Sequence, residues 1–449
     1  MVKNNKTKAF LSSNLFFIVL LSFFSIFFSL LKLNKGYTFE WDQADDASKV
    51  FSIISQKKPL LIGPRVSNDN GFFVGPYHYY FLLPFYLITK GDPVAGNYAV
   101  IFINALTVLI SFFIVRKVSN QKIAILSSFL LSIFLGKICW NAMYAPLIAI
   151  LTFYICYQAI KGQFSFSLAM LFAGFISNIH LVPASLVPII IFSFFLSSKK
   201  PTIKQIFLGI FLFCLPFIPI VIFDLRHDFL NLNKLFLMFF GNKNIQTESF
   251  IKYLWLRSFW RSLNIFGFFP VMVERLVFLF VLISSPFLFK GSKNKTLIAI
   301  WILFPLLLLS RYKGAISEYY YTIVISLLPF FISIIILKFI KNYKILFCLV
   351  FAFFVFSIYK IDKQSSPVTL NDKKAIVNYL INQKNDQPFN LSYETGLGLD
   401  FGFEYLFIYS GNTPKNINNA HLYTLFVDNN VPKNSNVVFK QNIYSLIRR

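Results

Sequence analysis

The chain has 449 residues, of which 56% are hydrophobic and only 14% charged. Soluble domains carry about 25% charged residues, so this composition excludes an ordinary soluble protein. The formal net charge of +25 would suit a nucleic-acid-binding protein, but such a protein gathers Lys and Arg on one face beside stacking aromatic residues. Here the basic residues stand in the gaps between long apolar blocks, which is typical of a membrane protein. We therefore expect membrane lipids as partners and no nucleic acid.

Apolar blocks follow one another along the chain and predict about eleven transmembrane helices, although several are shorter than the roughly 20 residues that a span needs. They lie at 10–31, 94–115, 123–137, 145–160, 164–180, 183–197, 205–223, 272–289, 296–310, 318–337 and 345–359. The first block is followed by Lys32, Leu33, Asn34 and Lys35 rather than by a small-residue cleavage site. This favours an uncleaved first helix over a signal peptide.

The connecting segments differ in charge from one side of the predicted helices to the other. The segments placed on the cytoplasmic side are 1–9, 116–122, 161–163, 198–204, 290–295 and 338–344, and they hold 16 Lys or Arg and no Asp or Glu. Because Lys and Arg near helix ends set the orientation, we expect a multi-pass protein of the cell membrane with a cytoplasmic N-terminus. All 18 acidic residues then fall elsewhere, so nearly every carboxylate available for catalysis lies on the outer side.

Two long segments on the outer side do not read as spans. Residues 32–93 contain the stretch GPYHYYFLLPFYLI, which is too short and proline-broken to span and rich in the Tyr that prefers an interface. Residues 224–271 carry Trp255, Arg257, Trp260 and Arg261 and suggest a second interfacial element. After residue 360 the composition turns to Asn, Lys and Asp, with a helical stretch from Lys373 to Asn382 and then the short apolar runs FNLSYE, LYTLFV, NVVF and NIYSLI, which we interpret as strands. The sequence thus predicts an all-α membrane domain over 1–360 and a small extracytoplasmic α/β domain over 361–449.

The four cysteines, Cys139, Cys156, Cys214 and Cys348, lie in or beside apolar blocks, without CxxC spacing or nearby His partners. We therefore expect neither a disulfide framework nor a zinc site. No residue is assigned as a metal ligand, and no cofactor is certain, although participation of a divalent cation stays open.

An acidic motif, Glu40-Trp41-Asp42-Gln43-Ala44-Asp45-Asp46-Ala47, follows the first helix. On a helix, Asp42 and Asp46 face the same way with Asp45 beside them, and such crowding raises the pKa of at least one carboxyl. The cluster suits a general base that takes a proton from an acceptor hydroxyl. The alternative interpretation is that Asp42 caps a helix and the other acids are solvated residues favoured by the helix dipole.

Other polar residues on the outer side are candidates for binding a substrate. Two Gly-Pro steps, at 63–64 and 75–76, impose turns, and the aromatic residues that follow can stack on a sugar or anchor the loop to lipid. His78 is a better functional candidate than His180 because it shares a loop with the acids. Cations suit a departing phosphate, although each can instead snorkel at the interface. The candidates for substrate binding are Gln43, Asp45, Arg65, Tyr77, His78, Tyr80, Arg311, Lys313, Glu318 and Tyr320, with Arg226 as a further outer cation.

The order of these features resembles that of the GT-C glycosyltransferases over residues 10–360. The pattern Asp42-Gln43-Ala44-Asp45-Asp46-Ala47, then Ile62-Gly63-Pro64, then Gly75-Pro76 with Tyr77, Tyr79 and Tyr80, and later Gly91-Asp92-Pro93, looks like that of the bacterial branch related to protein O-mannosyltransferases and lipid A aminoarabinose transferases. The resemblance implies a hexosyl- or pentosyltransferase of the cell envelope that uses a polyprenyl-phosphate sugar and inverts the anomeric carbon. It gives Asp42 the role of base and Asp46 a supporting role, and it implies a lipid, glycan or protein acceptor.

The chain departs from that branch at three places. Position 45 is acidic where a basic residue is expected. Gly75 stands where relatives carry a lysine before the proline, so Arg65, Arg311 or Lys313 would hold the phosphate instead. Trp140-Asn141 stand where relatives place a second acid, which argues against a two-acid or metal mechanism. An inactive homologue is therefore one alternative to an enzyme.

A transporter or flippase of lipid-linked glycans is a rival interpretation from another class, and a non-catalytic scaffold is a third. Transporters place ionisable or helix-breaking residues at the bilayer midplane, in related positions of two halves. The apolar blocks carry almost no charges and no such symmetry, so the sequence favours chemistry at the outer surface over translocation.

Overall fold

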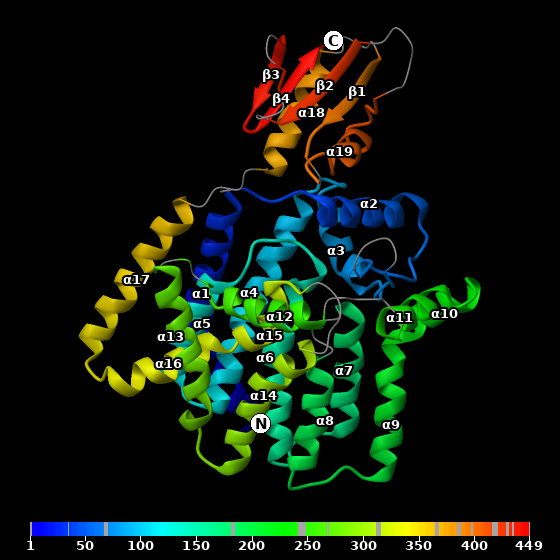
Figure 1. Cartoon of the computed structure of the whole chain (residues 1–449). Coiled ribbons are helices and arrows are strands. Elements are labelled where there is room, and N and C mark those ends of the chain that lie inside the picture. Colours follow the sequence, from blue (N-terminus) through cyan, green and yellow to red (C-terminus); the bar gives the residue numbers. More distant parts are fainter. Residues whose placement is uncertain are drawn as a thin grey trace.

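A bundle of long apolar helices forms the body of the chain, and a small sheet domain stands on one end of it (Figure 1). The structure is a computed structural model that describes residues 2–34, 36–66, 71–180, 185–240, 248–265, 267, 269–310, 316–363, 368–383, 388–396, 398–414, 421–427, 431–432 and 435–448. The helices of the body are α1 (Val2–Asn34), α2 (Trp41–Gln56), α3 (Tyr77–Ile88), α4 (Ala95–Val118), α5 (Gln121–Phe134), α6 (Ala145–Ile160), α7 (Phe166–Ile179), α8 (Leu186–Leu196), α9 (Ile203–Cys214), α10 (Ile218–Arg226), α11 (Leu230–Phe240), α12 (Glu248–Ser262), α13 (Val271–Ser284), α14 (Ser292–Leu309), α15 (Thr322–Ile325), α16 (Leu328–Phe339) and α17 (Tyr343–Lys363).

Every apolar block of the sequence contains a helix, so the all-α polytopic body is confirmed. Within the described ranges, seven helical stretches are long and apolar enough to cross a bilayer, or eight if the bent pair Glu318–Ile325 and Leu328–Phe339 is one span; the seven are Leu15–Leu33, Ala95–Val118, Asn141–Ile160, Ile203–Arg226, Val271–Leu288, Ser292–Leu309 and Tyr343–Lys363. Helices α5, α7 and α8 are apolar but shorter, and the count of eleven spans stays a prediction.

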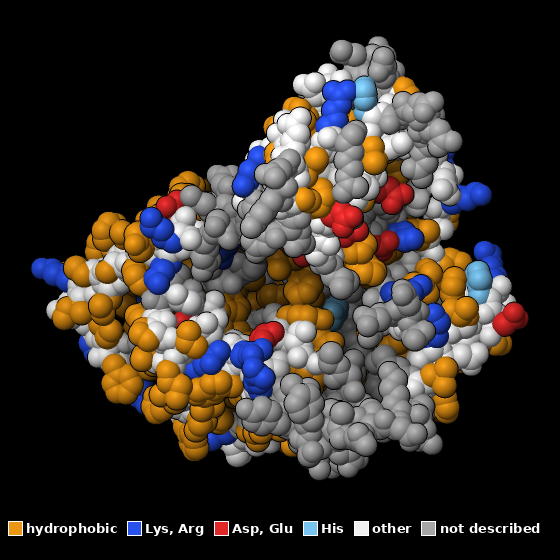
Figure 2. All heavy atoms as spheres, turned by 45° about the horizontal axis from the view of Figure 1, so that its top comes forward, with side chains coloured by type: hydrophobic (Ala, Val, Ile, Leu, Met, Phe, Trp, Pro, Cys, Tyr) orange, Lys and Arg blue, Asp and Glu red, His pale blue; other side chains and the backbone are white. Residues whose placement is uncertain are grey.

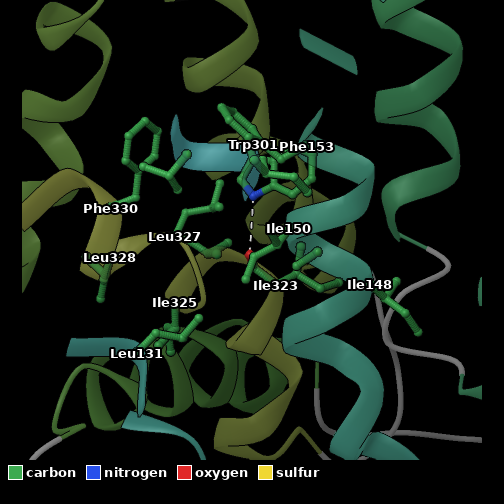
Figure 3. Close-up of a cluster of buried hydrophobic side chains, with 14 of the residues drawn as sticks. Leu131, Ile148, Ile150, Phe153, Trp301, Ile323, Ile325, Leu327, Leu328 and Phe330 are labelled. Carbon is green, nitrogen blue, oxygen red and sulfur yellow. Dashed lines mark hydrogen bonds between the residues drawn. The ribbon is translucent and has the colours of Figure 1, made fainter. Parts of the chain in front are cut away.

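The predicted helix over 318–337 is not straight. It is bent by 46° between Ile325 and Leu328, because the ring of Pro329 would clash with the carbonyl of Ile325 in a continuous helix. The bend also leaves the Ile323 carbonyl without its regular helical donor, since the Leu327 N–H bonds to Val324 instead. The buried Trp301 indole supplies the missing donor at 3.2 Å (Figure 3). Phe153 and Ile150 of α6 surround this hydrogen bond with apolar side chains. In such an apolar medium, a backbone carbonyl needs a hydrogen-bond donor from within the protein.

Three of the basic connections predicted to share one side of the membrane, 161–163, 198–204 and 290–295, lie together at one end of the bundle. Ser198, in the α8–α9 loop, accepts a hydrogen bond from Lys293 Nζ (3.2 Å) and lies 3.5 Å from the Ile160 carbonyl at the end of α6. These loops lie at the bottom of Figure 1, away from α2 and the sheet domain. The arrangement agrees with the predicted grouping of the loops, while the orientation of the termini stays a prediction.

The chain from residue 368 forms the predicted α/β unit. Helix α18 (Leu370–Gln383) is followed by β1 (Phe389–Glu394), α19 (Phe403–Tyr409), β2 (His421–Val427), β3 (Val437–Gln441) and β4 (Tyr444–Arg448). The sheet order is β1-β2-β4-β3, with β1 and β2 parallel and the other pairs antiparallel. Parallel neighbours need a crossover, and α19 lies in that connection. The sequence predicted the strands and α18 but not α19.

Asp372 ties the start of α18 to the β3–β4 hairpin, and we expect this tie to weaken in acid. Burial opposes its charged form, but hydrogen bonds from Gln441, Thr369 and Asn442 outweigh burial and lower the pKa of Asp372. A lowered pKa adds stability above the unfolded pKa of about 3.9 that is lost as the pH falls through the folded value. Asp372→Asn should cost about 1–3 kcal/mol at neutral pH, with a deficit that shrinks below about pH 4. Hydrogen exchange of the hairpin amides measures this, and a deficit independent of pH would contradict it.

Candidate active site

The acidic motif forms the first turns of α2, which lies across one end of the bundle beside α3 (Figure 1). Gln43 fixes the start of this helix. Its Oε1 accepts a hydrogen bond from the Glu40 N–H (3.1 Å), and its Nε2 donates to the Cys139 carbonyl (2.9 Å) in the connection between α5 and α6. The Gln43 amide thus anchors α2 to the bundle, and the substrate contact predicted for it stays a prediction.

Asp46 and His78 form a buried pair at the interface of α2 and α3. His78 Nε2 lies 2.8 Å from Asp46 Oδ2, and His78 Nδ1 lies 2.9 Å from the Tyr144 hydroxyl. With the proton on Nε2, His78 donates to Asp46 and accepts from Tyr144, so both ring nitrogens are satisfied. Because Asp46 and His78 are both fully enclosed by protein, this chain of hydrogen bonds holds α2 rather than meeting a substrate.

Asp42 lies one turn before Asp46 and reaches the surface. Its carboxyl nevertheless lies close enough to protein atoms for burial, and then the charge of Asp46, to raise its pKa from 3.8 to about 6. His78 lowers the pKa by a smaller amount. The two acids that the sequence placed on one helix face therefore differ in their surroundings. Asp46 is enclosed and hydrogen-bonded, whereas Asp42 is accessible and has a pKa at which it can exchange a proton near neutral pH.

Asp45 and Arg65 lie at the surface of the same region. Asp45 is half-exposed, 4.0 Å from Lys49, and it accepts a long hydrogen bond from the Tyr79 hydroxyl (3.5 Å). Burial raises its pKa, which the positive charges of Lys49 and Arg65 oppose. The exposed Arg65 lies over the ring of Phe73 at 4.8 Å, within a short pairing of residues 65 and 73. Both side chains can meet a ligand that approaches α2.

Tyr77 and Tyr80 were predicted to bind substrate, and both hydroxyls hold the loop together. Tyr77 donates to the Pro216 carbonyl (2.8 Å) and Tyr80 to the Leu60 carbonyl (2.7 Å). These bonds tie α3 to the break between α9 and α10 and to the segment after α2. Any substrate contact by these residues would have to come from their rings, and the predicted role stays a prediction.

A second group of residues reaches the site from the 3-10 turn before α15 (Glu318–Tyr321). Tyr319 packs edge-on against Trp140 (4.6 Å between ring centroids) and against Tyr320 (4.7 Å). Glu318 lies 3.7 Å from Arg261 at the end of α12. Trp140 precedes the short turn that ends at Tyr144, so this group is joined to the Asp46–His78 pair. Arg311 and Lys313 lie outside the described residues.

The face that carries α2 is hollowed below the sheet domain, as Figure 2 shows. Hydrophobic side chains line the hollow, and acidic, basic and His side chains stand around it. Glu318 and Arg261 are each about half-exposed (50% and 47%), so a charged pair is available on the side provided by α12. The geometry offers a carboxyl with a raised pKa, cations and exposed aromatic rings at one surface.

The sheet domain clamps the segment that leads into α2. The buried Lys373 ammonium donates to the Phe39 carbonyl (2.8 Å) and to the Phe401 carbonyl. Trp41, beside Asp42, contacts the Phe401 ring at 4.5 Å and is 55% exposed. Sequence reasoning missed this contribution, because Lys373 and Phe39 are 334 residues apart and nothing local to either residue marks the contact.

No protein-family model and no curated protein matches the sequence, but solved structures do. The oligosaccharyltransferase of Archaeoglobus fulgidus, in complex with Zn and sulfate, aligns with TM-score 0.51 and 12% identity over 89% of this chain and 62% of that chain. The same enzyme tethered to an acceptor peptide gives TM-score 0.50 and 13% identity over 89% and 63%. ArnT from Cupriavidus metallidurans, bound to undecaprenyl phosphate, gives TM-score 0.48 and 10% identity over 96% and 97%. This chain thus spans less than two thirds of the oligosaccharyltransferase.

The chain has the GT-C fold. The fold predicted from the order of the motifs is therefore confirmed, whereas identities of 12% and 13% reach no further than the fold. The assignment to the branch related to protein O-mannosyltransferases stays a prediction.

The lysine expected before the proline of the GT-C outer-loop signature has no room in this chain. A Cβ atom at Gly75 would lie 1.5 Å from Asn178 Oδ1, and one at Gly63 would lie 2.0 Å from the Gly75 carbonyl oxygen. The backbone of Gly75 also donates to the Asn178 carbonyl (2.7 Å). Gly75 thus packs closely against the end of α7, and Gly63 packs closely against the backbone of Val74 and Gly75.

Gly75→Lys should therefore destabilise the protein, because the backbone of the loop would have to leave α7. We expect a loss of at least about 2 kcal/mol, as for other overpacked sites. Shortening the obstructing side chain in Gly75→Lys with Asn178→Ala should recover part of that loss, measured as the thermal midpoint in detergent. Asn178→Ala alone is the control. A single Gly75→Lys variant as stable as the wild type would contradict the packing described here.

A metal-dependent site finds little support in these side chains. Within the described ranges, no group of three or more His, Cys, Asp and Glu residues is arranged to hold a metal ion. Asp46 is engaged by His78, and Asn141, near the position of the second acid in relatives, donates to the Ile179 carbonyl at 3.2 Å.

Proposed function

We propose that this protein transfers a sugar from a polyprenyl-phosphate donor to an acceptor hydroxyl, with inversion at the anomeric carbon. Asp42 carries the proposal, because it is accessible and the pKa of its carboxyl is raised to about 6. A general base works best when its pKa lies near the operating pH. The GT-C fold shared with an oligosaccharyltransferase and the order of the outer-loop motifs support the reaction class.

In the proposed step, the acceptor oxygen attacks the anomeric carbon and gives its proton to Asp42. The bond from that carbon to the phosphate oxygen breaks, and its electron pair leaves with the polyprenyl phosphate. Phosphate is already a good leaving group, so fixed positive charge can replace a general acid. Among the described residues, we assign the stabilisation of the departing phosphate to Arg65 and Arg261. Arg311 and Lys313, which were predicted from the sequence, would add to this positive charge.

The placement of buried charge favours this reaction over the transport of lipid-linked glycans. The fully buried charged side chains among the described residues, together with His78, are Asp46, Asp224, Glu274, Asp372 and Lys373. Asp224 and Glu274 lie in terminal turns of candidate spans, and the others lie outside them. A transporter would instead hold ionisable groups near the bilayer midplane.

Reconstitution in liposomes with a panel of polyprenyl-phosphate hexoses and pentoses tests the proposal and identifies the sugar. Lipid, glycan and peptide acceptors can be offered in turn, and NMR of the product reports the configuration at the anomeric carbon. We expect transfer with one donor class and an inverted product. A retained configuration would exclude direct attack assisted by Asp42.

The pH dependence of transfer should follow the ionisation of Asp42. Asp42 can act as a base only as the carboxylate. Because its pKa is raised to about 6, it becomes protonated in mildly acidic solution and can then no longer accept a proton. The rate at low donor concentration should therefore rise with pH through a midpoint near 6 and level off above it. An unshifted carboxyl would give a midpoint near 4, and that result would contradict the environment described for Asp42.

A further inference from the structure

We propose that a basic hollow at the opposite end of the bundle binds the phosphate headgroup of an anionic membrane lipid. The hollow has a volume of about 210 Å³ and lies between the α6–α7 turn and the α8–α9 loop. Its lining combines small, polar and basic residues with apolar ones: Gly162, Gln163, Ser165, Lys199, Lys200 and Gln205, together with Phe164, Phe166, Phe194 and Pro201. This site is independent of the proposed transfer reaction, because none of these residues belongs to the surface that carries Asp42.

The turn and the loop approach each other closely because residue 162 is a glycine. Gly162 has a φ of +72°, and a Cβ atom there would lie 3.0 Å from the Cβ of Lys199. A side chain at this position would therefore be strained and crowded. The contact holds Lys199 beside the start of α7, where the hollow lies.

The groups around the hollow favour an anion. Lys199 and Lys200 contribute positive charge, and Lys200 Nζ also donates to the Phe195 carbonyl near the end of α8. Ser165 occupies the cap position of α7, but its side chain makes no capping hydrogen bond, whereas α9 is capped by Thr202, whose hydroxyl accepts from the Gln205 N–H (3.3 Å). The first-turn N–H groups of α7 therefore add to the attraction that the two lysines exert on a phosphate.

The surroundings favour a lipid as the source of that phosphate. The outward faces of α8 and α9 expose large apolar side chains beside the hollow, including Phe195 (70% exposed) and Phe207 (68%), along which acyl chains can lie. Pockets for drug-sized molecules measure about 300–1,000 Å³, so this smaller hollow suits a compact headgroup. Basic pockets between transmembrane helices are a common form of headgroup recognition.

Native mass spectrometry of the full-length protein in detergent tests the proposal, with phosphatidylglycerol and phosphatidylcholine as probes. We expect the wild type to retain phosphatidylglycerol, and the Lys199→Gln/Lys200→Gln variant to bind it at least about tenfold more weakly. The matched control is Lys341→Gln/Lys344→Gln, which removes the same charge from the loop after α16 and the first turn of α17. Equal binding by all three proteins, or equal retention of phosphatidylcholine, would overturn the proposal.

A second variant separates loss of binding from loss of folding. Ser165→Asp places a carboxylate at the cap of α7, where it should preserve or raise the thermal midpoint of the lipid-free protein and repel an anionic headgroup. We expect phosphatidylglycerol to raise the midpoint of the wild type but not of this variant. Inorganic phosphate is the third arm. The same rise with phosphate alone, or an undiminished rise with lipid in Ser165→Asp, would contradict a lipid headgroup site.

Discussion

Replacing Asp42 with Asn is expected to reduce sugar transfer by at least about 100-fold, the lower end of what general base catalysis contributes. The same change should leave the protein at least as stable as the wild type. Because its folded pKa is raised above the usual value, Asp42 favours the folded state at low pH and loses that contribution as the pH rises through about 6. The neutral Asn side chain carries no such penalty at pH 7.

This combination of effects distinguishes a catalytic base from a carboxylate that only stabilises the start of a helix. A carboxylate that merely stabilised the helix dipole of α2 would contribute about 0.3–1 kcal/mol, so its removal would lower the thermal midpoint and leave transfer intact. Asp228→Asn is the matched control, because Asp228 is an exposed acid with a φ of +52°, a conformation that Asn tolerates well. The cap of α2 is Glu40, so the interpretation that Asp42 caps the helix is wrong, and its alternative role is that of a first-turn acid. Unchanged transfer by Asp42→Asn, with a lower midpoint, would show that Asp42 stabilises the helix dipole and does not act in the reaction.

His78→Leu is expected to have the largest effect on stability. It removes the only described donor to Asp46 Oδ2 and the acceptor for the Tyr144 hydroxyl, leaving a carboxyl buried without its partner. Breaking a buried pair in this way costs about 3–5 kcal/mol. We expect a marked fall in the thermal midpoint, measured in detergent by tryptophan fluorescence, and a loss of transfer as α2 shifts.

Tyr144→Phe provides the graded control for His78. It deletes one hydroxyl from the same chain and should cost about 1 kcal/mol, with transfer largely retained. If His78→Leu abolished transfer while its thermal midpoint matched that of the wild type, His78 would contact the substrate rather than hold α2. The buried position of its ring argues for the structural role.

The sequence predicts those parts of the fold that the lipid bilayer requires. A bilayer requires long apolar helices separated by charged ends, so blocks such as 94–115 appear as helices in the structure. The strand FNLSYE is likewise β1. By contrast, the bend before Leu328 depends on one proline, and the length of an apolar segment does not reveal such a bend.

The sequence brings the acids of the candidate site together on one helix, but it does not show which of them is buried. Helical spacing placed Asp42 and Asp46 on one face, yet whether each side chain is enclosed depends on partners such as His78, which lies 32 residues from Asp46. The departure at Gly75 was visible in the sequence. Its cause, the side chain of Asn178, lies about a hundred residues further along the chain and is a property of the tertiary packing alone.

The fate of a labelled donor in proteoliposomes tests the central claim most directly. A polyprenyl-phosphate sugar labelled in the sugar would be presented to the reconstituted wild-type protein together with an acceptor. We expect the label to leave the lipid phosphate and appear on the acceptor, and to remain on the lipid with Asp42→Asn. If the label instead crossed the bilayer still attached to its lipid, or stayed in place with every donor, the protein would not be a transferase.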